Sequence, residues 1–310
     1  MTIRLALVGF GKIATDQHQP AIGANDDFEL VAAADPRLAT DPTANPAQFA
    51  DLDELLDADL GIDAVALCVP PQHRFAMACQ ALAAGLHVLL EKPPGITLSE
   101  VADLQARAGQ AGVTLYASWH SRHAPAIEPA REWLAGRDIQ AVTVEWREDV
   151  KVFHPGQGWI WTPGGLGVFD PGINALSILT HILERPFALR RARLDIPGNR
   201  AMPIAAELSF QQADGVPIEA VFDFRHTEQP CWRICVDTDA GRLELTQGGA
   251  AMAIDGQPQI DEDKAEYAGV YARFAALIEK RICDVDVRAF QHVADAFMLG
   301  ERRTVEDFNE

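Results

Sequence analysis

The chain has 310 residues, of which 48% are hydrophobic and 23% charged, and its formal net charge is −19. This composition is ordinary for a globular protein, and the length is sufficient for two domains. The acidic balance argues against a nucleic-acid partner and against an anionic membrane surface, because both attract basic proteins.

Cysteine usage and the start of the chain indicate the compartment. The five cysteines are odd in number and form no CxxC pair, so neither a disulfide framework nor a zinc site is expected. The first residues enter a strand pattern directly, which is not typical of a signal peptide. No apolar run has the length of a membrane span. We therefore expect a reduced, cytoplasmic protein without a bound metal.

The first strand leads into a glycine motif. Residues 3–8 form a β-like run, residues 9–14 follow the pattern G-x-G-x-x-A, and a helical pattern continues to about residue 24. The glycines permit a tight turn and a close approach to a pyrophosphate, while the helix N-terminus supplies N–H donors. A chance glycine turn is the alternative. The position between a strand and a helix is the one that a dinucleotide-binding motif requires.

The second predicted strand, residues 28–34, ends at an acidic residue. Asp35 lies 24 positions after Gly11, close to the usual spacing of the acid that binds the adenosine ribose. Arg37 could attract a 2′-phosphate. We therefore predict a preference for NAD, with NADP tolerated.

Strands and helices continue to alternate up to residue 120. Helical patterns cover residues 51–58 and 72–84 and begin again at the capping box of residues 97–100. β-like runs cover residues 62–69 and 113–119. This alternation predicts a doubly wound parallel sheet, and we assign residues 1–120 to a dinucleotide-binding Rossmann domain.

Between these helices, a further apolar run begins at Val88 and continues into Glu91, Lys92 and two prolines. The prolines stop the strand because they lack the N–H of the ladder. Lys92 is therefore expected at the carboxyl end of a parallel strand, which is the edge where ligands bind in open α/β sheets. An ordinary surface lysine at a strand end is the alternative.

Residues 121–310 are predicted to form a second, α+β domain for substrate binding and oligomerisation. A helix is expected at 125–136 and a strand at 139–150, with Val142, Val144 and Trp146 on one face. Uninterrupted β-like runs imply a mostly antiparallel sheet. These runs cover residues 187–197, 204–212, 216–226 and 231–246, and helical segments near 264–282 and 288–300 follow them.

Two segments of this second part contain candidate site residues. Residues 153–161 are rich in glycine, proline and aromatic side chains, so they either cover a pocket or pack as a structural loop. A glycine-rich stretch then leads into a helix that runs to about residue 183. Asp170 and Asn174 are four residues apart in this helix and share one of its faces.

Three motifs together resemble the Gfo/Idh/MocA oxidoreductase family: residues 9–14, Pro70-Pro71-Gln72-His73 and Glu91-Lys92-Pro93, in this order. The resemblance implies a second domain with a large open sheet, through which members often dimerise, and often a cis bond at Pro93. It places Lys92 beside the nicotinamide and the reacting hydroxyl. The expected cofactor-binding residues are Gly9, Phe10, Gly11, Lys12, Ile13, Asp35, Arg37, Val69, Pro70, Pro71, His73, Glu91 and Lys92.

The sequence Asp-Pro-Gly-Ile-Asn at 170–174, together with residues 119–122, 148–150 and 154–157, resembles the branch of bacterial L-arabinose and D-galactose 1-dehydrogenases. Asn174 stands where the family usually has a histidine base. The resemblance implies NAD(P)-dependent oxidation of an aldose to its lactone, with Lys92, Asp170 and Asn174 as catalytic residues. Of Lys92 and Asp170, we favour Asp170 as the proton acceptor. The implied sugar site comprises Lys92, His120, Glu148, His154, Asp170 and Asn174.

Other interpretations of the same residues remain open. The chain could be an inositol or other polyol dehydrogenase, or a regulatory protein that binds a dinucleotide without catalysis. His120 and Glu148 could be hydrogen-bonded core residues at strand ends. A metal site formed by His120, His123 and His154 is disfavoured, because no cysteine or acidic triad completes a recognisable zinc set.

Overall fold

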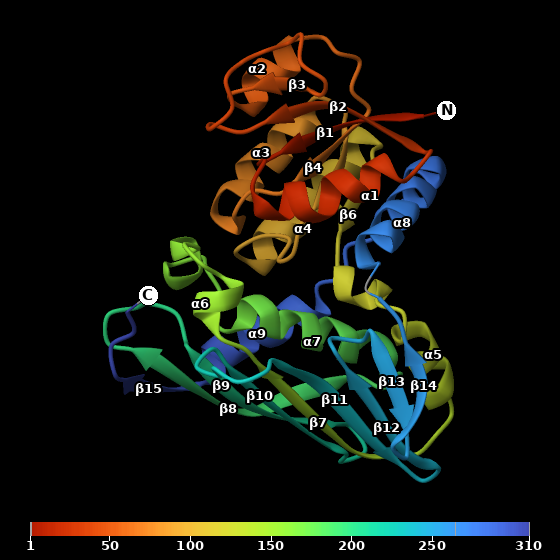
Figure 1. Ribbon diagram of the computed structural model, residues 1–310, viewed down its shortest axis with the longest axis vertical. Coiled ribbons are helices and arrows are strands. Elements are labelled where there is room, and N and C mark those ends of the chain that lie inside the picture. Colours follow the sequence, from red (N-terminus) through yellow and green to blue (C-terminus); the bar gives the residue numbers. More distant parts are fainter. Residues whose placement is uncertain (1, 264, 310) are drawn as a thin grey trace. The chain divides into compact units, whose positions relative to one another are not determined.

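The computed structural model describes residues 2–263 and 265–309 and divides into two compact units (Figure 1). Unit 1 contains the chain up to Trp119 together with Tyr267–Val287. Unit 2 contains His120–Glu266 and the chain from Arg288 onward. Among the described residues, no helix is both long enough and apolar enough to cross a bilayer.

Unit 1 contains the expected doubly wound sheet. Its six strands pair in parallel in the order β3-β2-β1-β4-β5-β6. Such strands are covered on both faces, which explains why all four residues of β4 are buried. The strands are β1 (Ile3–Val8), β2 (Phe28–Ala34), β3 (Ala47–Phe49), β4 (Ala64–Leu67), β5 (His87–Leu90) and β6 (Leu115–Ala117).

The helices of unit 1 begin and end largely where the capping signals indicate. Thr97 caps α4 by accepting a hydrogen bond from the Glu100 N–H, and Gly112 ends the helix in the left-handed region. The helical segments are η1 (Ala14–His18), α1 (Gln19–Gly23), α2 (Leu52–Asp57), α3 (Pro71–Ala83), α4 (Leu98–Ala111) and α8 (Glu266–Lys280).

Helix α8 belongs to unit 1 from Tyr267 onward, which differs from the expectation that residues 121–310 form one domain. Tyr271 and Phe274 are fully buried in a core cluster that also contains Leu5, Leu89 and Tyr116. The helix therefore covers one face of the Rossmann sheet. Helical periodicity shows that a segment is amphipathic but not which sheet its apolar face will meet.

Unit 2 is built on a nine-stranded sheet that is mixed but mostly antiparallel, as expected. Its order is β14-β13-β12-β11-β7-β10-β9-β8-β15. The strands are β7 (Ile139–Arg147), β8 (Phe187–Pro197), β9 (Ala205–Gln212), β10 (Pro217–Asp223), β11 (Cys231–Thr238), β12 (Gly241–Thr246), β13 (Ala251–Ile254), β14 (Gln257–Asp261) and β15 (Glu301–Val305).

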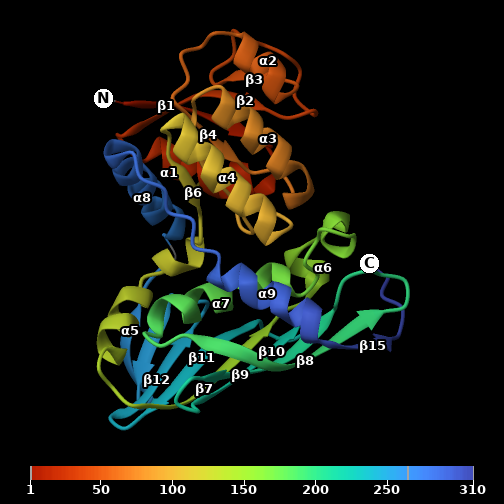
Figure 2. The same cartoon turned by 180° about the vertical axis from the view of Figure 1, so that it is seen from behind.

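Helices cover one face of this sheet, as both views of the ribbon show (Figure 2). Val142, Val144 and Trp146 are buried on alternate positions of β7, as predicted. The ring of Phe169 in α7 meets that of Phe222 in β10, with centroids 5.8 Å apart. The helical segments are η2 (His120–His123), α5 (Ile127–Leu134), α6 (Val150–Phe153), η3 (Gly158–Trp161), α7 (Phe169–Ile182) and α9 (Arg288–Leu299).

Several strands differ from the sequence-based expectation. The single run predicted at 231–246 is a hairpin of β11 and β12 that turns at residues 239–240. The short strands β3, β13, β14 and β15 had not been expected, and β6 is shorter than the predicted 113–119. Short strands at a sheet edge have little periodicity of their own, because their pairing partners determine them.

Candidate functional site

The glycine motif forms a tight turn at the carboxyl end of β1. Gly9 has a φ of +86°, and a Cβ at this position would lie 2.8 Å from the backbone nitrogen of Val69. Only glycine fits without moving the Val69 backbone. Helical structure follows within a few residues, so the first N–H groups of the helix are available to an anion. The turn has the features needed to hold a pyrophosphate.

Asp35 follows β2 and is almost fully buried. Its carboxylate accepts hydrogen bonds from the backbone N–H of Phe10 at 2.8 Å and from the backbone and guanidinium of Arg37. These hydrogen bonds, first that of the Arg37 side chain, lower the pKa of Asp35 to about 2. The acid therefore links the glycine turn to a largely exposed arginine, and these residues fit the ribose end of a dinucleotide.

Glu91 lies in a buried polar network behind the end of β5. Its Oε1 accepts hydrogen bonds from the Tyr267 hydroxyl at 2.8 Å and from Ser118, and it lies 3.1 Å from His18 Nε2. His18 Nδ1 in turn lies 2.7 Å from the Tyr271 hydroxyl oxygen. Burial opposes the charge on His18, but Cys68, Tyr271 and Glu91 outweigh it and raise its pKa well above the ordinary value. Glu91 therefore takes part in a buried hydrogen-bond network, in addition to its expected position near the cofactor.

The turn after Glu91 is held by a residue that sequence reasoning missed. Buried Arg74 of α3 donates hydrogen bonds to the carbonyl oxygens of Glu91, Pro93 and Val69. The Lys92–Pro93 bond is cis, as the family resemblance implied. His73, the expected site residue, is exposed. Helical spacing could have identified its neighbour, because Arg74 interrupts the buried stripe of Pro71, Ala78 and Ala81.

In unit 2, three predicted site residues form one buried cluster. Glu148 follows β7, His154 follows α6 and Asp170 lies in the first turn of α7. His154 Nε2 is 2.7 Å from Glu148 Oε1, and His154 Nδ1 is 3.6 Å from Asp170 Oδ2. Trp232 of β11 donates a hydrogen bond to Glu148 Oε2 at 2.7 Å. Trp232 had not been predicted, although it pairs with Trp146 across the strands and lies on the same face.

The remaining predicted residues of unit 2 lie around this cluster or apart from it. Asn174 is half-buried, one helical turn after Asp170. His120 lies in η2, and its Nδ1 is 2.7 Å from Glu266 Oε2. Nearby His123 is mostly buried; burial, followed by the charges of His120 and His181, lowers its pKa to about 4. The expected roles of His120 and Asn174 in the sugar site stay predictions.

The aromatic residues of the segment 153–161 pack in two different places. Trp161 is buried and packs on the rings of Phe224 and Phe308, so this part is structural. Phe153 instead meets the Trp232 ring edge to face at 5.2 Å. In the part of the chain that the structure describes, no group of three or more metal-ligating side chains is placed to hold a metal ion.

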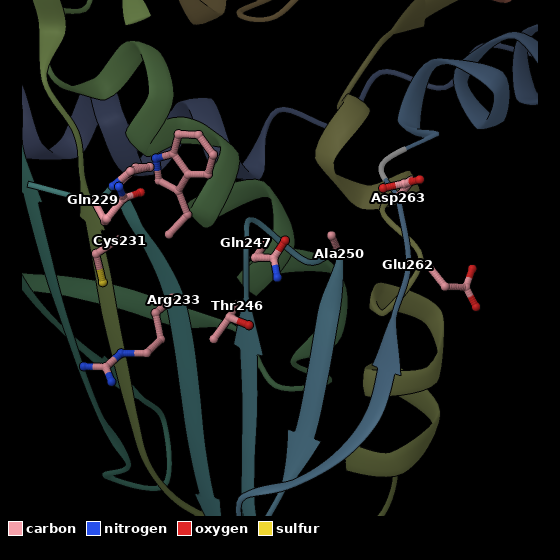
Figure 3. Close-up of a pocket in the computed structure, with 10 residues that line it drawn as sticks. Gln229, Cys231, Arg233, Thr246, Gln247, Ala250, Glu262 and Asp263 are labelled. Atoms are coloured by element: carbon pink, nitrogen blue, oxygen red, sulfur yellow. The ribbon is translucent and has the colours of Figure 1, made fainter. Parts of the chain in front are cut away.

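A cavity of about 580 Å³ lies at one end of β11 and β12. Figure 3 shows Cys231 and Arg233 along β11, with Thr246 and Gln247 opposite them at the end of β12. None of the predicted sugar-site residues lines this cavity, but Trp232 does, and its indole also holds Glu148. The lining residues are Gln229, Pro230, Cys231, Trp232, Arg233, Thr246, Gln247, Ala250, Glu262 and Asp263.

The chain is similar to known oxidoreductases. Residues 3–118 match the model of the oxidoreductase family with an NAD-binding Rossmann fold, Gfo/Idh/MocA. The chain is 48% identical over 306 residues to galactose 1-dehydrogenase of Pseudomonas fluorescens, covering 99% of this chain and 98% of that protein.

Solved structures show the same fold over the whole chain. The D-galactose-1-dehydrogenase protein of Rhizobium etli superposes with a TM-score of 0.94 and 52% identity, covering 99% of this chain and 98% of that one. A 3-ketoreductase of Actinomadura kijaniata, solved with NADP and TDP-benzene, has a TM-score of 0.83 and 18% identity and covers both chains fully. That second likeness concerns the fold alone.

Proposed function

Because the chain belongs to the Gfo/Idh/MocA oxidoreductase family, we propose that it is an NAD-dependent aldose 1-dehydrogenase acting on D-galactose and L-arabinose. The observation that carries this proposal is the 48% identity, over nearly the full length, to a galactose 1-dehydrogenase. The buried carboxylates and the histidine of unit 2 are consistent with it, since they could bind sugar hydroxyls and accept a proton.

In the proposed reaction, the anomeric carbon of the sugar loses a hydride and its hydroxyl loses a proton, giving a lactone. A bound nicotinamide dinucleotide would supply the hydride acceptor. Asp170 takes the proton, Lys92 polarises the C1 oxygen and Asn174 orients it. His120, Glu148 and His154 complete the set of groups that bind the sugar.

We propose that the cofactor-binding set is the one expected from the sequence. The glycine turn supplies room and N–H donors for the pyrophosphate, and Asp35 supplies an acceptor for the ribose 2′-hydroxyl. Asp35 would repel a 2′-phosphate, whereas Arg37 would attract one. The proposed preference is therefore for NAD, with NADP tolerated.

The test is the steady-state rate of NADH formation with D-galactose, L-arabinose and D-glucose. The first two share their stereochemistry at C2, C3 and C4 and differ by one hydroxymethyl group, a difference that a pocket discriminates by only ~1–3 kcal/mol. Both should be oxidised. Glucose, with its C4 hydroxyl inverted, would leave a buried polar group unpaired and should react much more slowly.

The outcomes separate the candidate functions. Comparable efficiency on glucose would contradict the sugar assignment, and oxidation of inositol in preference to any aldose would favour a polyol dehydrogenase. Dinucleotide binding without oxidation of any sugar or polyol would favour a regulatory protein.

We further propose a cytoplasmic homodimer. The five cysteines, all of which are free, support a reducing compartment.

A further inference from the structure

His154 lies between two buried carboxylates contributed by different elements of unit 2. Its Nε2 is 2.7 Å from Glu148 Oε1, and its Nδ1 is 3.6 Å from Asp170 Oδ2 and 3.4 Å from Gln157 Oε1. The side chains of His154, Glu148 and Asp170 are 13%, 4% and 5% exposed. An imidazole in this position faces a carboxylate through each of its ring nitrogens.

The hydrogen bonds around Glu148 determine which ring nitrogen of His154 carries a proton. An ionised carboxylate only accepts hydrogen bonds, so Glu148 accepts from the Trp232 indole at one oxygen and from His154 Nε2 at the other. The Glu148 backbone N–H is also held, by the Asp223 carbonyl at 3.0 Å. We assign the Nε2–H tautomer to the neutral imidazole, which leaves its Nδ1 lone pair on the side of Asp170 and the Gln157 side chain.

The histidine ring is also fixed by packing. Its centroid lies 5.3 Å from that of Phe224, which directly follows β10. In this arrangement an acid orients a histidine towards a third group. Such a set of residues is recognised by its geometry and not by its position in the sequence. Glu148 is the orienting acid and Asp170 the third group.

We propose that His154 is a proton-relay residue that acts through Asp170 in the dehydrogenase reaction. This inference rests on the proposed function. Asn174, on the next turn of α7, has an amide side chain that cannot take up a proton at neutral pH. A carboxylate is a weak base in this range, whereas an imidazole titrates within it. His154 supplies an imidazole beside Asp170.

Two proton transfers and one hydride transfer make up the proposed step. The O–H bond of the C1 hydroxyl breaks and its proton bonds to an Asp170 carboxylate oxygen. The C1–H bond breaks with its electron pair, which leaves as hydride to the nicotinamide acceptor, so the sugar is oxidised and the acceptor is reduced. The proton then moves from Asp170 to Nδ1 of His154. The carboxylate is restored, and the imidazolium is paired with Glu148.

The 3.6 Å between Nδ1 and Oδ2 is too long for a hydrogen bond, so proton transfer requires the two atoms to approach to about 2.8 Å. Catalytic hydrogen bonds are often long before substrate binds.

The first test is the pH dependence of kcat with D-galactose and NAD. The wild-type kcat should rise with pH through one ionisation. His154→Gln should lose that ionisation and lower kcat about 100-fold, while the KM for the sugar changes less than kcat. Glu148→Gln should move the ionisation to lower pH, because it removes the negative charge that stabilises the imidazolium. Added imidazole should partly restore the activity of His154→Ala.

The matched control is His181→Gln. His181 also pairs with a glutamate in unit 2, Glu128, but it lies near the C-terminal end of α7 and its partner is half-exposed. This variant should keep the wild-type profile. A His154→Gln enzyme with the wild-type ionisation and kcat would overturn the relay and leave the dehydrogenase assignment intact. A wild-type enzyme that oxidises no aldose would instead overturn the proposed function.

A second test does not depend on activity. In the wild-type protein labelled with ¹⁵N-histidine, the resonances of His154 should show the Nε2–H tautomer when the ring is neutral. His154→Gln identifies them by their loss. A neutral Nδ1–H tautomer would leave no lone pair towards Asp170 and would overturn the proposal.

Discussion

Asp35 is the residue whose surroundings bear most directly on cofactor choice. Its carboxylate receives four hydrogen bonds, three of them from Arg37. The guanidinium is mostly exposed and can rotate away, whereas the acid is held by the Phe10 N–H of the glycine turn. The same pair therefore presents an acceptor for a ribose hydroxyl and a donor for a phosphate.

Replacing Asp35 by alanine should shift cofactor preference towards NADP. Hydrogen bonds to charged groups contribute about 1.5–3 kcal/mol, so the ratio of kcat/KM for NAD over that for NADP should fall by about tenfold or more. Arg37→Ala is the matched comparison and should weaken NADP use more than NAD use. An unchanged ratio in Asp35→Ala would contradict the assignment of this acid to the ribose.

Lys92 and Asp170 should act on chemistry more than on cofactor binding. Positioned proton transfer contributes about 10²–10⁴-fold, so Lys92→Ala and Asp170→Ala should each lower kcat within that range. The double variant should be little worse than the poorer single one, since groups that act as a unit are not additive. Asn174→Ala should lower kcat less, because an orienting residue moves no proton.

The measurement that checks this is single-turnover sugar oxidation at saturating NAD, together with the NAD dissociation constant of each variant. The dissociation constants should change little, because the proposed pyrophosphate and ribose contacts come from Gly9 to Ile13 and from Asp35. A near-native single-turnover rate in Lys92→Ala would return this residue to an ordinary lysine at the end of a strand.

His123 should make the protein less stable in mild acid. Burial, followed by His120 and His181, lowers its pKa to about 4, whereas in an unfolded chain histidine titrates near ~6.5. Between these values the unfolded state binds the additional proton, so this contribution to stability is lost as pH falls from about 6.5 to about 4. Below about pH 4 the folded protein is protonated at His123 as well, so this residue causes no further loss of stability.

The check is the free energy of unfolding in urea at pH 7 and at pH 4.5. His123→Gln should reduce the difference between the two values by about 2 kcal/mol relative to the wild type. His73, which is exposed, provides the control, and His73→Gln should leave the difference unchanged. An equal pH dependence in His123→Gln and the wild type would show that His123 does not contribute.

At the scale of elements, α3 positions the turn that carries Lys92. Arg74 reaches from the first turn of this helix to carbonyl oxygens on both sides of Lys92, those of Glu91 and Pro93. A planar guanidinium presents several donors in fixed directions, which a lysine ammonium does not. The helix and the strand end are therefore joined by one buried side chain.

Arg74→Met should destabilise the protein by about 2–5 kcal/mol, because buried carbonyls lose their donor. Arg74→Lys keeps the charge and should fall between the methionine variant and the wild type in both stability and kcat. Urea unfolding and steady-state rates measure both effects. His73→Ala, at the exposed neighbour, should stay within about 0.5 kcal/mol of the wild type. A methionine variant with native stability and kcat would show that the turn does not need this arginine.

At the scale of the whole molecule, the proposed homodimer would use the sheet face of unit 2 that carries no helices (Figure 1). Side chains on this face form ion pairs across neighbouring strands. Arg233 of β11 pairs with Glu145 of β7 and Glu244 of β12, and Arg193 of β8 pairs with Glu207 of β9. A face of half-exposed, mutually paired charges can meet a second copy without burying an isolated charge.

Light scattering during gel filtration should therefore give twice the chain mass of 33.8 kDa. Arg233→Glu places three acids together on this face and should shift the protein towards monomer. Arg107→Glu, on α4 of unit 1, is an equivalent charge reversal beside Asp103 and should not change the mass. A wild-type monomer at micromolar concentration would rule out the dimer.

Features that depend on neighbours in the chain could be predicted from the amino-acid sequence. Alternating strands and helices specified the parallel sheet of unit 1, and the motifs at Gly9 and Glu91 indicated the family whose NAD-binding Rossmann model matches residues 3–118. The period-two pattern around Val144 specified which face of β7 is buried. Each of these features depends on residues within a few positions of one another, so a local pattern is sufficient.

The contacts between distant segments could not be predicted from the sequence, and the folded structure shows them. It assigned most of α8 to unit 1 and placed Arg74 against the turn at Lys92. It also brought His154 between Glu148 and Asp170, and Trp232 against Glu148. These contacts connect side chains from separate elements. A polar residue in the sequence shows that it can form a hydrogen bond, but its partner is determined by the packing of the elements around it.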